Sequence, residues 1–113
     1  MRIKDPDLLK LLRLQATECA LSGATTRLSL HHIYPRGQGG DDVRGNIVVL
    51  EGDGVSGVHG KVEHKDPETL AALHLHLLHE RPDTIEYLDG KLGSLDRVLA
   101  WMDRTYTPRS ERV

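Results

Sequence analysis

Two adjacent histidines, His31 and His32, and a later pair four residues apart, His59 and Glu63, are the residues of this chain best suited to chemistry. Four residues is about one helical turn, so an imidazole and a carboxylate at this spacing project from one helix face. Together with one histidine from a neighbouring element, they would bind a divalent cation and leave positions open for water or phosphate. A further histidine nearby, with a pKa near ~6.5, could accept a proton at neutral pH.

The adjacent histidines end a segment that alternates like a β-strand. In residues 27–32, "RLSLHH", apolar and polar side chains alternate, which places Leu28 and Leu30 on one face. Neighbouring residues of a strand point to opposite faces, so His31 and His32 cannot share one packing role. The alternation would let His31 face an ion while His32 faces a water molecule.

A loop and two further elements complete the centre of the chain. Residues 46–50, "NIVVL", are mostly β-branched and predict a second strand, which Asn46 opens. The intervening "YPRGQGGDDVRG" contains proline, four glycines and two aspartates, a composition typical of a loop. Residues 58–65, "VHGKVEHK", predict a short helix that would carry His59 and Glu63. We therefore expect an antiparallel two-stranded hairpin followed by a short helix.

Longer helices are expected on both sides of this centre. An aspartate followed by a proline is a common helix start, and it predicts one helix over about 6–17 and another from Asp66-Pro67 to Arg81-Pro82. Apolar residues at helical spacing predict a last helix over about 91–104. The expected fold class is α+β, in one domain. The domain would span 1–113, with a core at about 19–66 and helical extensions at 5–17 and 67–106.

The composition limits the classes of protein and partner. The chain has 113 residues, 28% of them charged, and a formal net charge of −2. This balance excludes a histone-like polycation, so contact with nucleic acid would need a local patch or a metal ion. Cys19 is the only cysteine, which excludes a disulfide within the chain. The sequence has no signal-like start and no apolar run of membrane-spanning length, and we expect a cytoplasmic protein with no membrane partner.

The segment "LHHIYPRGQGGDDVRGNIVVLEGDGVSGVHGKVE" closely resembles the HNH endonucleases, the nucleases with a ββα-metal core, and in particular their phage-borne branch. The similarity covers about 19–64. The His-His pair, the proline and Gly-Gly of the loop, the asparagine before an apolar strand and the His-Gly helix start all occur in order. The resemblance implies metal-dependent hydrolysis of DNA, by nicking or double-strand cleavage, with 5′-phosphate and 3′-hydroxyl products. A phage-encoded protein would work in the host cytoplasm.

The resemblance also implies a role for each matched residue. His31 matches the first metal ligand, and His32 matches the general base. Asn46 matches the residue that orients this base through the loop between the strands. His59 matches the second metal ligand, and Glu63 stands where many members have a further histidine, so it is a third candidate ligand. The ion would be Mg²⁺, Mn²⁺, Ni²⁺ or Zn²⁺.

The chain departs from the family pattern at its cysteines. Many relatives bind a structural zinc ion through paired cysteines, but here Ser22, Glu51 and Val58 stand where the partners of Cys19 would be expected. A structural zinc site made of four cysteines is therefore not expected. We expect the flanking helices to stabilise the core instead, with Cys19 as a small buried residue.

Three basic residues are candidate contacts to DNA. Arg36 and Arg44 flank the loop, and Lys61 lies on the short helix, although ordinary solvated segments also carry such charges. The apolar helix faces after Pro67 would serve core packing or a homodimer interface, and a dimer would allow both strands to be cut.

Two other functions fit the same residues. The first is an HNH-fold module that binds nucleic acid, or assists in packaging, and has lost cleavage. The second is a helical interaction protein whose histidine-rich centre binds metal only for folding. For His31 and His32 alone, a strand end with one buried and one solvated imidazole would be the simpler interpretation.

Overall fold

The computed structural model describes residues 2–107 and confirms the α+β fold class. The helices and strands are α1 (Pro6–Gln15), β1 (Leu28–His32), β2 (Ile47–Glu51), α2 (Gly57–Glu63), α3 (Pro67–Glu80), α4 (Pro82–Leu92) and α5 (Leu95–Tyr106). Two short 3₁₀ turns, η1 (Arg36–Gln38) and η2 (Arg44–Asn46), lie in the loop between the strands. The predicted hairpin and short helix are therefore present in the expected order.

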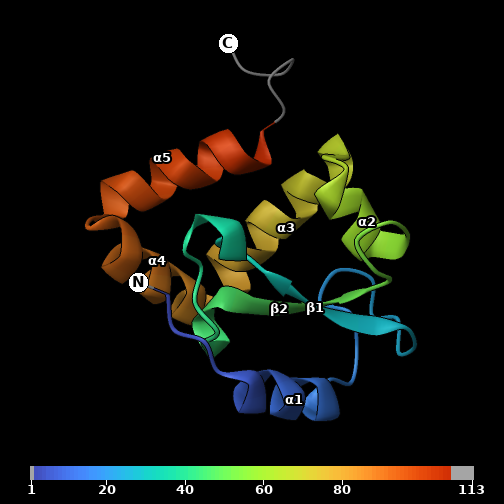
Figure 1. Cartoon of the computed structure of the whole chain (residues 1–113). Helices are drawn as coiled ribbons and strands as arrows, with labels where there is room; N and C mark the ends of the chain where they lie inside the picture. The colour runs from blue at the N-terminus through green and yellow to red at the C-terminus, as the bar shows by residue number, and fades with distance from the viewer. Residues whose placement is uncertain (1, 108–113) are drawn as a thin grey trace.

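The two strands form an antiparallel hairpin whose register places His32 opposite Ile47 and Leu28 opposite Glu51. Figure 1 shows α1 on one side of the hairpin and α3, α4 and α5 on the other. The short helix α2 contacts both β2 and α3. The end of β1 that carries the histidines is thus close to the helix that carries His59.

The two Asp-Pro sequences begin helices as predicted. The carboxylate of Asp5 accepts a hydrogen bond from the Leu8 N–H at 3.0 Å, and that of Asp66 accepts one from the Thr69 N–H at 3.1 Å. Each bond satisfies a backbone donor of the first turn that has no partner within the helix. In both helices the proline is the first helical residue, where its missing N–H costs nothing.

The sequence predicted only two helices after α2, and this prediction was wrong because Pro82 begins a separate helix, α4. Gly90 and four charged residues interrupt the apolar spacing of this segment, so its helical pattern is weak. Gly93 ends α4 with a left-handed φ of 99°, and α5 then starts at Leu95 rather than near residue 91. Glycine adopts this conformation without the steric cost that other residues incur.

One cluster of buried side chains joins the hairpin, α2 and the C-terminal helices. Its members are Cys19, Ile33, Val48, Leu50, Val62, Leu70, Leu73, Leu77, Leu88, Val98, Met102 and Tyr106. Helix α1 has only Leu9 as a buried residue, and Leu9 lies outside this cluster. The C-terminal helices therefore provide most of the apolar packing of the hairpin, and burial of each leucine contributes about 1.5–3 kcal/mol.

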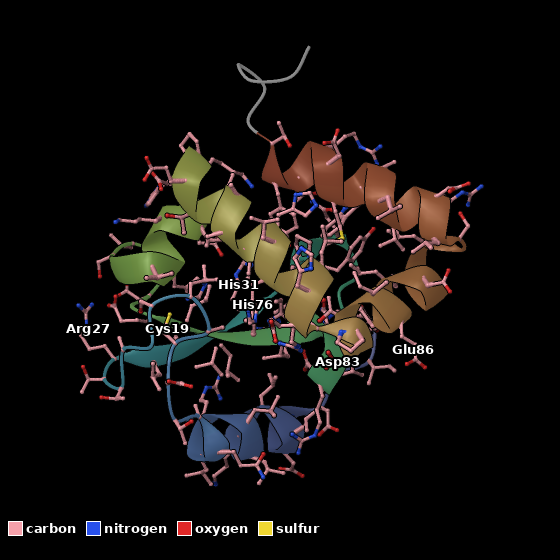
Figure 2. The ribbon with its side chains drawn as sticks, turned by 180° about the vertical axis from the view of Figure 1, so that it is seen from behind. Cys19, Arg27, His31, His76, Asp83 and Glu86 are labelled. Atoms are coloured by element: carbon pink, nitrogen blue, oxygen red, sulfur yellow. The ribbon has the colours of Figure 1, made fainter. Side chains whose placement is uncertain are left out.

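Cys19 lies beside the sheet (Figure 2) and is 2% exposed, which confirms that it is a small buried residue. The next residue, Ala20, donates its N–H to the Val49 carbonyl at 2.9 Å. This bond ties the segment before β1 to the second strand.

Between residues 2 and 107, no helix has both the length and the apolar character that a membrane crossing requires.

Candidate metal centre

All three predicted ligands, His31, His59 and Glu63, lie together between β1 and α2. His31 Nδ1 lies 3.3 Å from His59 Nε2 and 3.2 Å from Glu63 Oε1. His59 Nε2 lies 3.4 Å from the same carboxylate oxygen. Two imidazole nitrogens and one carboxylate oxygen thus form a nearly equilateral triangle.

This triangle has the size that a small divalent ion requires. Ligand atoms at about 2.0–2.2 Å from a tetrahedral ion lie about 3.3–3.6 Å from one another. The separations of 3.2, 3.3 and 3.4 Å agree with this range to about 0.1 Å. The side chains of the two histidines are 12% exposed and that of Glu63 is 47% exposed, so the cluster is open to solvent on the glutamate side. Three ligands with an open position are typical of catalytic rather than structural zinc sites.

Ser29, which was not among the residues predicted from the sequence, positions the ring of His59. Its hydroxyl lies 2.7 Å from His59 Nδ1 and 2.7 Å from the Gly52 carbonyl oxygen. The carbonyl can only accept, so the hydroxyl donates to Gly52 and accepts from His59 Nδ1–H. His59 Nε2 is then left with the lone pair that a metal ligand needs. Ser29 and His31 share one strand face because they are two residues apart.

We expect Ser29→Ala to weaken metal binding by about 10–100-fold, because groups that orient a ligating histidine contribute on this scale. Titration calorimetry with Mn²⁺ or Zn²⁺ would measure the change. Ser22→Ala, in an exposed turn outside the cluster, is the matched control and should bind metal like the unaltered chain. Equal affinities for the two variants would contradict the role of Ser29.

The charge state of the cluster suits a cation. Hydrogen bonding to His31, followed by the charges of the two histidines, lowers the pKa of Glu63 to about 2, so its carboxylate is ionised at neutral pH. Burial lowers the pKa of His59, and the neighbouring His31 lowers it further, while Glu63 opposes both effects. A lowered pKa keeps His59 neutral near pH 7 and able to bind a metal ion.

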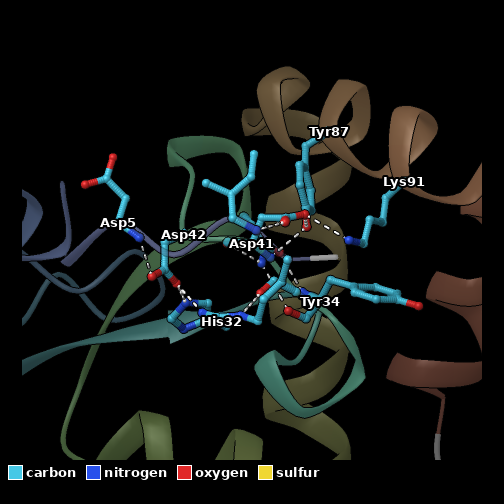
Figure 3. Close-up of polar contacts among 11 residues, drawn as sticks. Asp5, His32, Tyr34, Asp41, Asp42, Tyr87 and Lys91 are labelled. Carbon is cyan, nitrogen blue, oxygen red and sulfur yellow. Dashed lines mark hydrogen bonds and ion pairs between the residues drawn. The ribbon is translucent and has the colours of Figure 1, made fainter. Parts of the chain in front are cut away.

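His32 points away from the cluster and contacts Asp42. Its Nε2 lies 2.8 Å from Asp42 Oδ1, a contact drawn in Figure 3. An ionised carboxylate only accepts hydrogen bonds, so Nε2 carries the hydrogen and Nδ1 is left as a proton acceptor. Burial lowers the pKa of His32, and the bond to Asp42 offsets part of that effect. The imidazole is therefore neutral, with a fixed tautomer, and able to accept a proton. Asp42, which fixes this tautomer, was not among the site residues predicted from the sequence.

Asn46 has no hydrogen bond to His32, although the resemblance matched it to the residue that orients the base. Its side chain is completely buried and closes the loop between the strands. Its Oδ1 accepts from the Tyr34 N–H at 2.7 Å, and its Nδ2 donates to the carbonyls of Tyr34 and Asp41, both at 3.0 Å. Asn46 thus acts on the loop, and Asp42 of that loop contacts His32.

Asp41 anchors the same loop to α4 and to the N-terminal segment (Figure 3). Its carboxylate accepts from the Tyr87 hydroxyl at 2.6 Å, from Lys91 Nζ at 3.0 Å and from the Ile3 N–H at 2.6 Å. Its neighbour Asp42 accepts from Arg2 at 2.6 Å. The two adjacent aspartates therefore connect α4, the start of the chain and His32.

We expect Asp41→Asn to make folding less sensitive to acid. Burial opposes ionisation of Asp41, but the bonds from Tyr87 and Ile3 and the charge of Lys91 lower its pKa to about 2. A carboxylate whose pKa is lower in the folded chain than in the unfolded chain stabilises the fold at pH values above the unfolded pKa of ~3.9. This contribution, about 2 kcal/mol, is lost as the pH falls through the pKa of the folded chain.

Urea denaturation at several pH values between about 5 and 2 would test this, because that is where the stabilisation is lost. The free energy of unfolding should fall less steeply with acid for Asp41→Asn than for the unaltered chain. Glu86→Gln, which removes an exposed carboxylate of α4, controls for the change in net charge. Parallel pH profiles for Asp41→Asn and the unaltered chain would contradict the prediction.

A cavity of about 360 Å³ lies beside the cluster and is lined by His31, His32, His59 and Glu63. Of the three basic residues predicted to contact DNA, Arg36 lines this cavity. Arg44 instead lines a second hollow with Asp83 and Glu86 of α4, away from His31 (Figure 2). Lys61 lines a third hollow near the start of α3. The structure thus brings together the five predicted residues His31, His32, His59, Glu63 and Arg36.

Comparison of the chain with protein-family models, with curated proteins and with solved structures found no match.

Proposed function

We propose that this protein is a metal-dependent endonuclease of the HNH type that hydrolyses DNA phosphodiester bonds. The observation that carries the proposal is the triangle of His31 Nδ1, His59 Nε2 and Glu63 Oε1, which shares a cavity with the neutral base His32. A structural metal site would not need an oriented base beside it. The paired arrangement of an ion site and a base is suited to hydrolysis.

The three cluster residues would hold the ion, and the ion would supply neutralisation of phosphate charge and stabilisation of the leaving oxygen. His32 has a different task, because it lies on the other face of β1 and contacts Asp42. Its free Nδ1 would take a proton from the attacking water molecule.

The resulting hydrolysis needs no covalent intermediate with the protein. The water oxygen forms a bond to phosphorus, its proton passes to His32, and the bond from phosphorus to the 3′-oxygen breaks. Solvent returns a proton to the 3′-oxygen, which leaves a 3′-hydroxyl and a 5′-phosphate. Asp42 keeps the tautomer of His32 correct and stabilises the imidazolium that forms.

A panel of metals and substrates would test the proposal. Supercoiled plasmid, linear duplex and single-stranded DNA would each be incubated with Mg²⁺, Mn²⁺, Ni²⁺ or Zn²⁺, and nicked or cut products would be separated on gels. We expect cleavage with at least one ion and its loss in His59→Ala. His79→Ala, which removes an exposed imidazole of α3, is the matched control and should cleave normally.

If no form of DNA were cleaved with any of the four ions, the nuclease proposal would be contradicted. The result would favour the alternative of a nucleic-acid-binding module that has lost cleavage. Chelation provides the test of a purely structural site. If EDTA unfolded the protein at the temperature of the cleavage assay, as happens to domains that fold only with their metal, the interaction-protein alternative would gain support.

A further inference from the structure

The cavity beside the cluster has two basic residues at its edge, and only one of them was predicted from the sequence. Arg36 of η1 and Lys65, which follows α2, both line the cavity. Among the described residues, neither the Arg36 nor the Lys65 side chain forms an ion pair or a hydrogen bond. By contrast, Arg2, Arg81 and Lys91 each form an ion pair with an aspartate. Arg36 also lies close enough to His32 to lower the pKa of that imidazole. Two unpaired cations therefore flank the proposed site of phosphate chemistry.

The backbone turn after α2 directs Lys65 to this position. Lys65 has a φ of +63°, a left-handed conformation that is uncommon for residues other than glycine. Its N–H donates to the Val62 carbonyl at 3.2 Å, and the Asp66 N–H donates to the Lys61 carbonyl at 2.9 Å. These bonds close the turn between α2 and α3. Lys61, one helical turn earlier, does not line the cavity.

The remaining wall of the cavity is mostly apolar. It includes Leu30, Ile33, Pro35 and Val62, and the end of α5 contributes Thr105 and Tyr106. At about 360 Å³ the cavity is in the lower part of the range of roughly 300–1,000 Å³ found for small-molecule sites, and it is far too small for a double helix. In a duplex the bases are stacked and paired, so they cannot contact such a wall.

We infer that this cavity receives one unpaired nucleotide of single-stranded DNA, with its base against the apolar wall and its neighbouring phosphates against Arg36 and Lys65. The inference rests on the proposed nuclease function and names its preferred substrate. The nucleotide lies beside the bond to be cut, since His31, His32 and Glu63 line the same cavity. DNA with a single-stranded segment, a flap or a frayed end is then preferred over an intact duplex.

Binding measurements in EDTA test the inference independently of catalysis. The anisotropy of a short fluorescein-labelled single strand, alone or annealed to its complement, would be followed as the protein is added at low salt. We expect the single strand to bind about tenfold more tightly than the duplex, which is the effect of removing roughly 55 Å² of apolar surface from water. Thr105→Trp, which fills the cavity, should remove this preference. Leu99→Trp, at an exposed position of α5, should retain it.

The salt dependence of single-strand binding tests whether Lys65, and not Lys61, contacts a phosphate. Each phosphate contact to a single strand contributes about 0.7 to the slope of log affinity against log salt concentration. Lys65→Gln should therefore reduce the slope by about 0.7, while Lys61→Gln, the matched change one helical turn earlier, should not alter it.

The outcomes distinguish this inference from the proposed function. Undetectable binding of the single strand, or unchanged binding in both Thr105→Trp and Lys65→Gln, overturns the cavity assignment even if the protein cleaves DNA. The expected binding pattern without cleavage by any metal supports the cavity assignment and refutes the nuclease.

Discussion

His32→Ala is expected to lower the rate of DNA cleavage by about 10²–10⁴-fold, the usual contribution of a general base. Its imidazole is hydrogen-bonded to Asp42 and is not one of the three candidate metal ligands. The variant should therefore bind metal with unchanged affinity. A single-turnover nicking rate at saturating metal, measured beside titration calorimetry, separates these two properties.

A change to Asp42 tests whether its hydrogen bond to His32 contributes to base catalysis. Asp42→Asn keeps a side chain of the same size but no longer requires Nε2 of His32 to carry the hydrogen. The cleavage rate should fall for Asp42→Asn as well, by less than for His32→Ala, and metal affinity should again be unchanged. A His32→Ala protein that cleaves within about twofold of the unaltered rate would contradict the assigned base, since base catalysis contributes far more.

Asn46→Ala is expected to cost about 3 kcal/mol of stability, which is a large share of the roughly 5–15 kcal/mol that folds a typical domain. The side chain is completely buried and makes three hydrogen bonds to the backbone of the loop. Each bond contributes about 1 kcal/mol, and truncation would also leave the Tyr34 N–H and two carbonyls without partners. Denaturation by urea would measure the loss.

The conservative variant Asn46→Asp tests whether loop closure is the cause. It retains an oxygen for the Tyr34 N–H but loses both donated bonds, and it should be destabilised as well. Amide hydrogen exchange at Tyr34 should accelerate strongly in Asn46→Ala, since its acceptor is removed. A stability loss below about 1 kcal/mol with unchanged exchange at Tyr34 would show that Asn46 does not close the loop.

The hairpin, α2 and the helices that begin at Pro6 and Pro67 could be predicted from the sequence because local signals specify them. Strand alternation and aspartate caps act over a few residues, and the structure contains the capping bonds of Asp5 and Asp66. Helix α4 begins at Pro82 and is ended by Gly93, but it has no side-chain cap at its start, and its apolar spacing is weak. Its place depends on packing of Leu88 in the common core and on the contacts of Tyr87 and Lys91 with Asp41.

The candidate site shows the same division between local and distant effects. The spacing of His59 and Glu63 determines that they share a helix face, and strand alternation separates His31 from His32. Ser29 could have been identified by the same rule, because it lies two residues before His31 on one strand face. Asp42 gave no such signal, since its approach to His32 depends on the path of the whole loop.

The basic residues illustrate how little a charge pattern reveals about placement. Arg36 and Arg44 both flank one loop in the sequence, yet they line separate hollows on the molecule. Lys65 gave no signal that distinguished it from Lys61, because its position follows from a left-handed turn between two helices.

The central claim is that His31, His59 and Glu63 hold the ion that cleavage requires. Anomalous diffraction at the zinc edge, from crystals grown with Zn²⁺, tests it most directly. We expect a peak at about 2.0–2.2 Å from His31 Nδ1, His59 Nε2 and Glu63 Oε1, and its loss in His59→Ala. A peak elsewhere on the molecule, with these three atoms bound to no ion, would contradict the account.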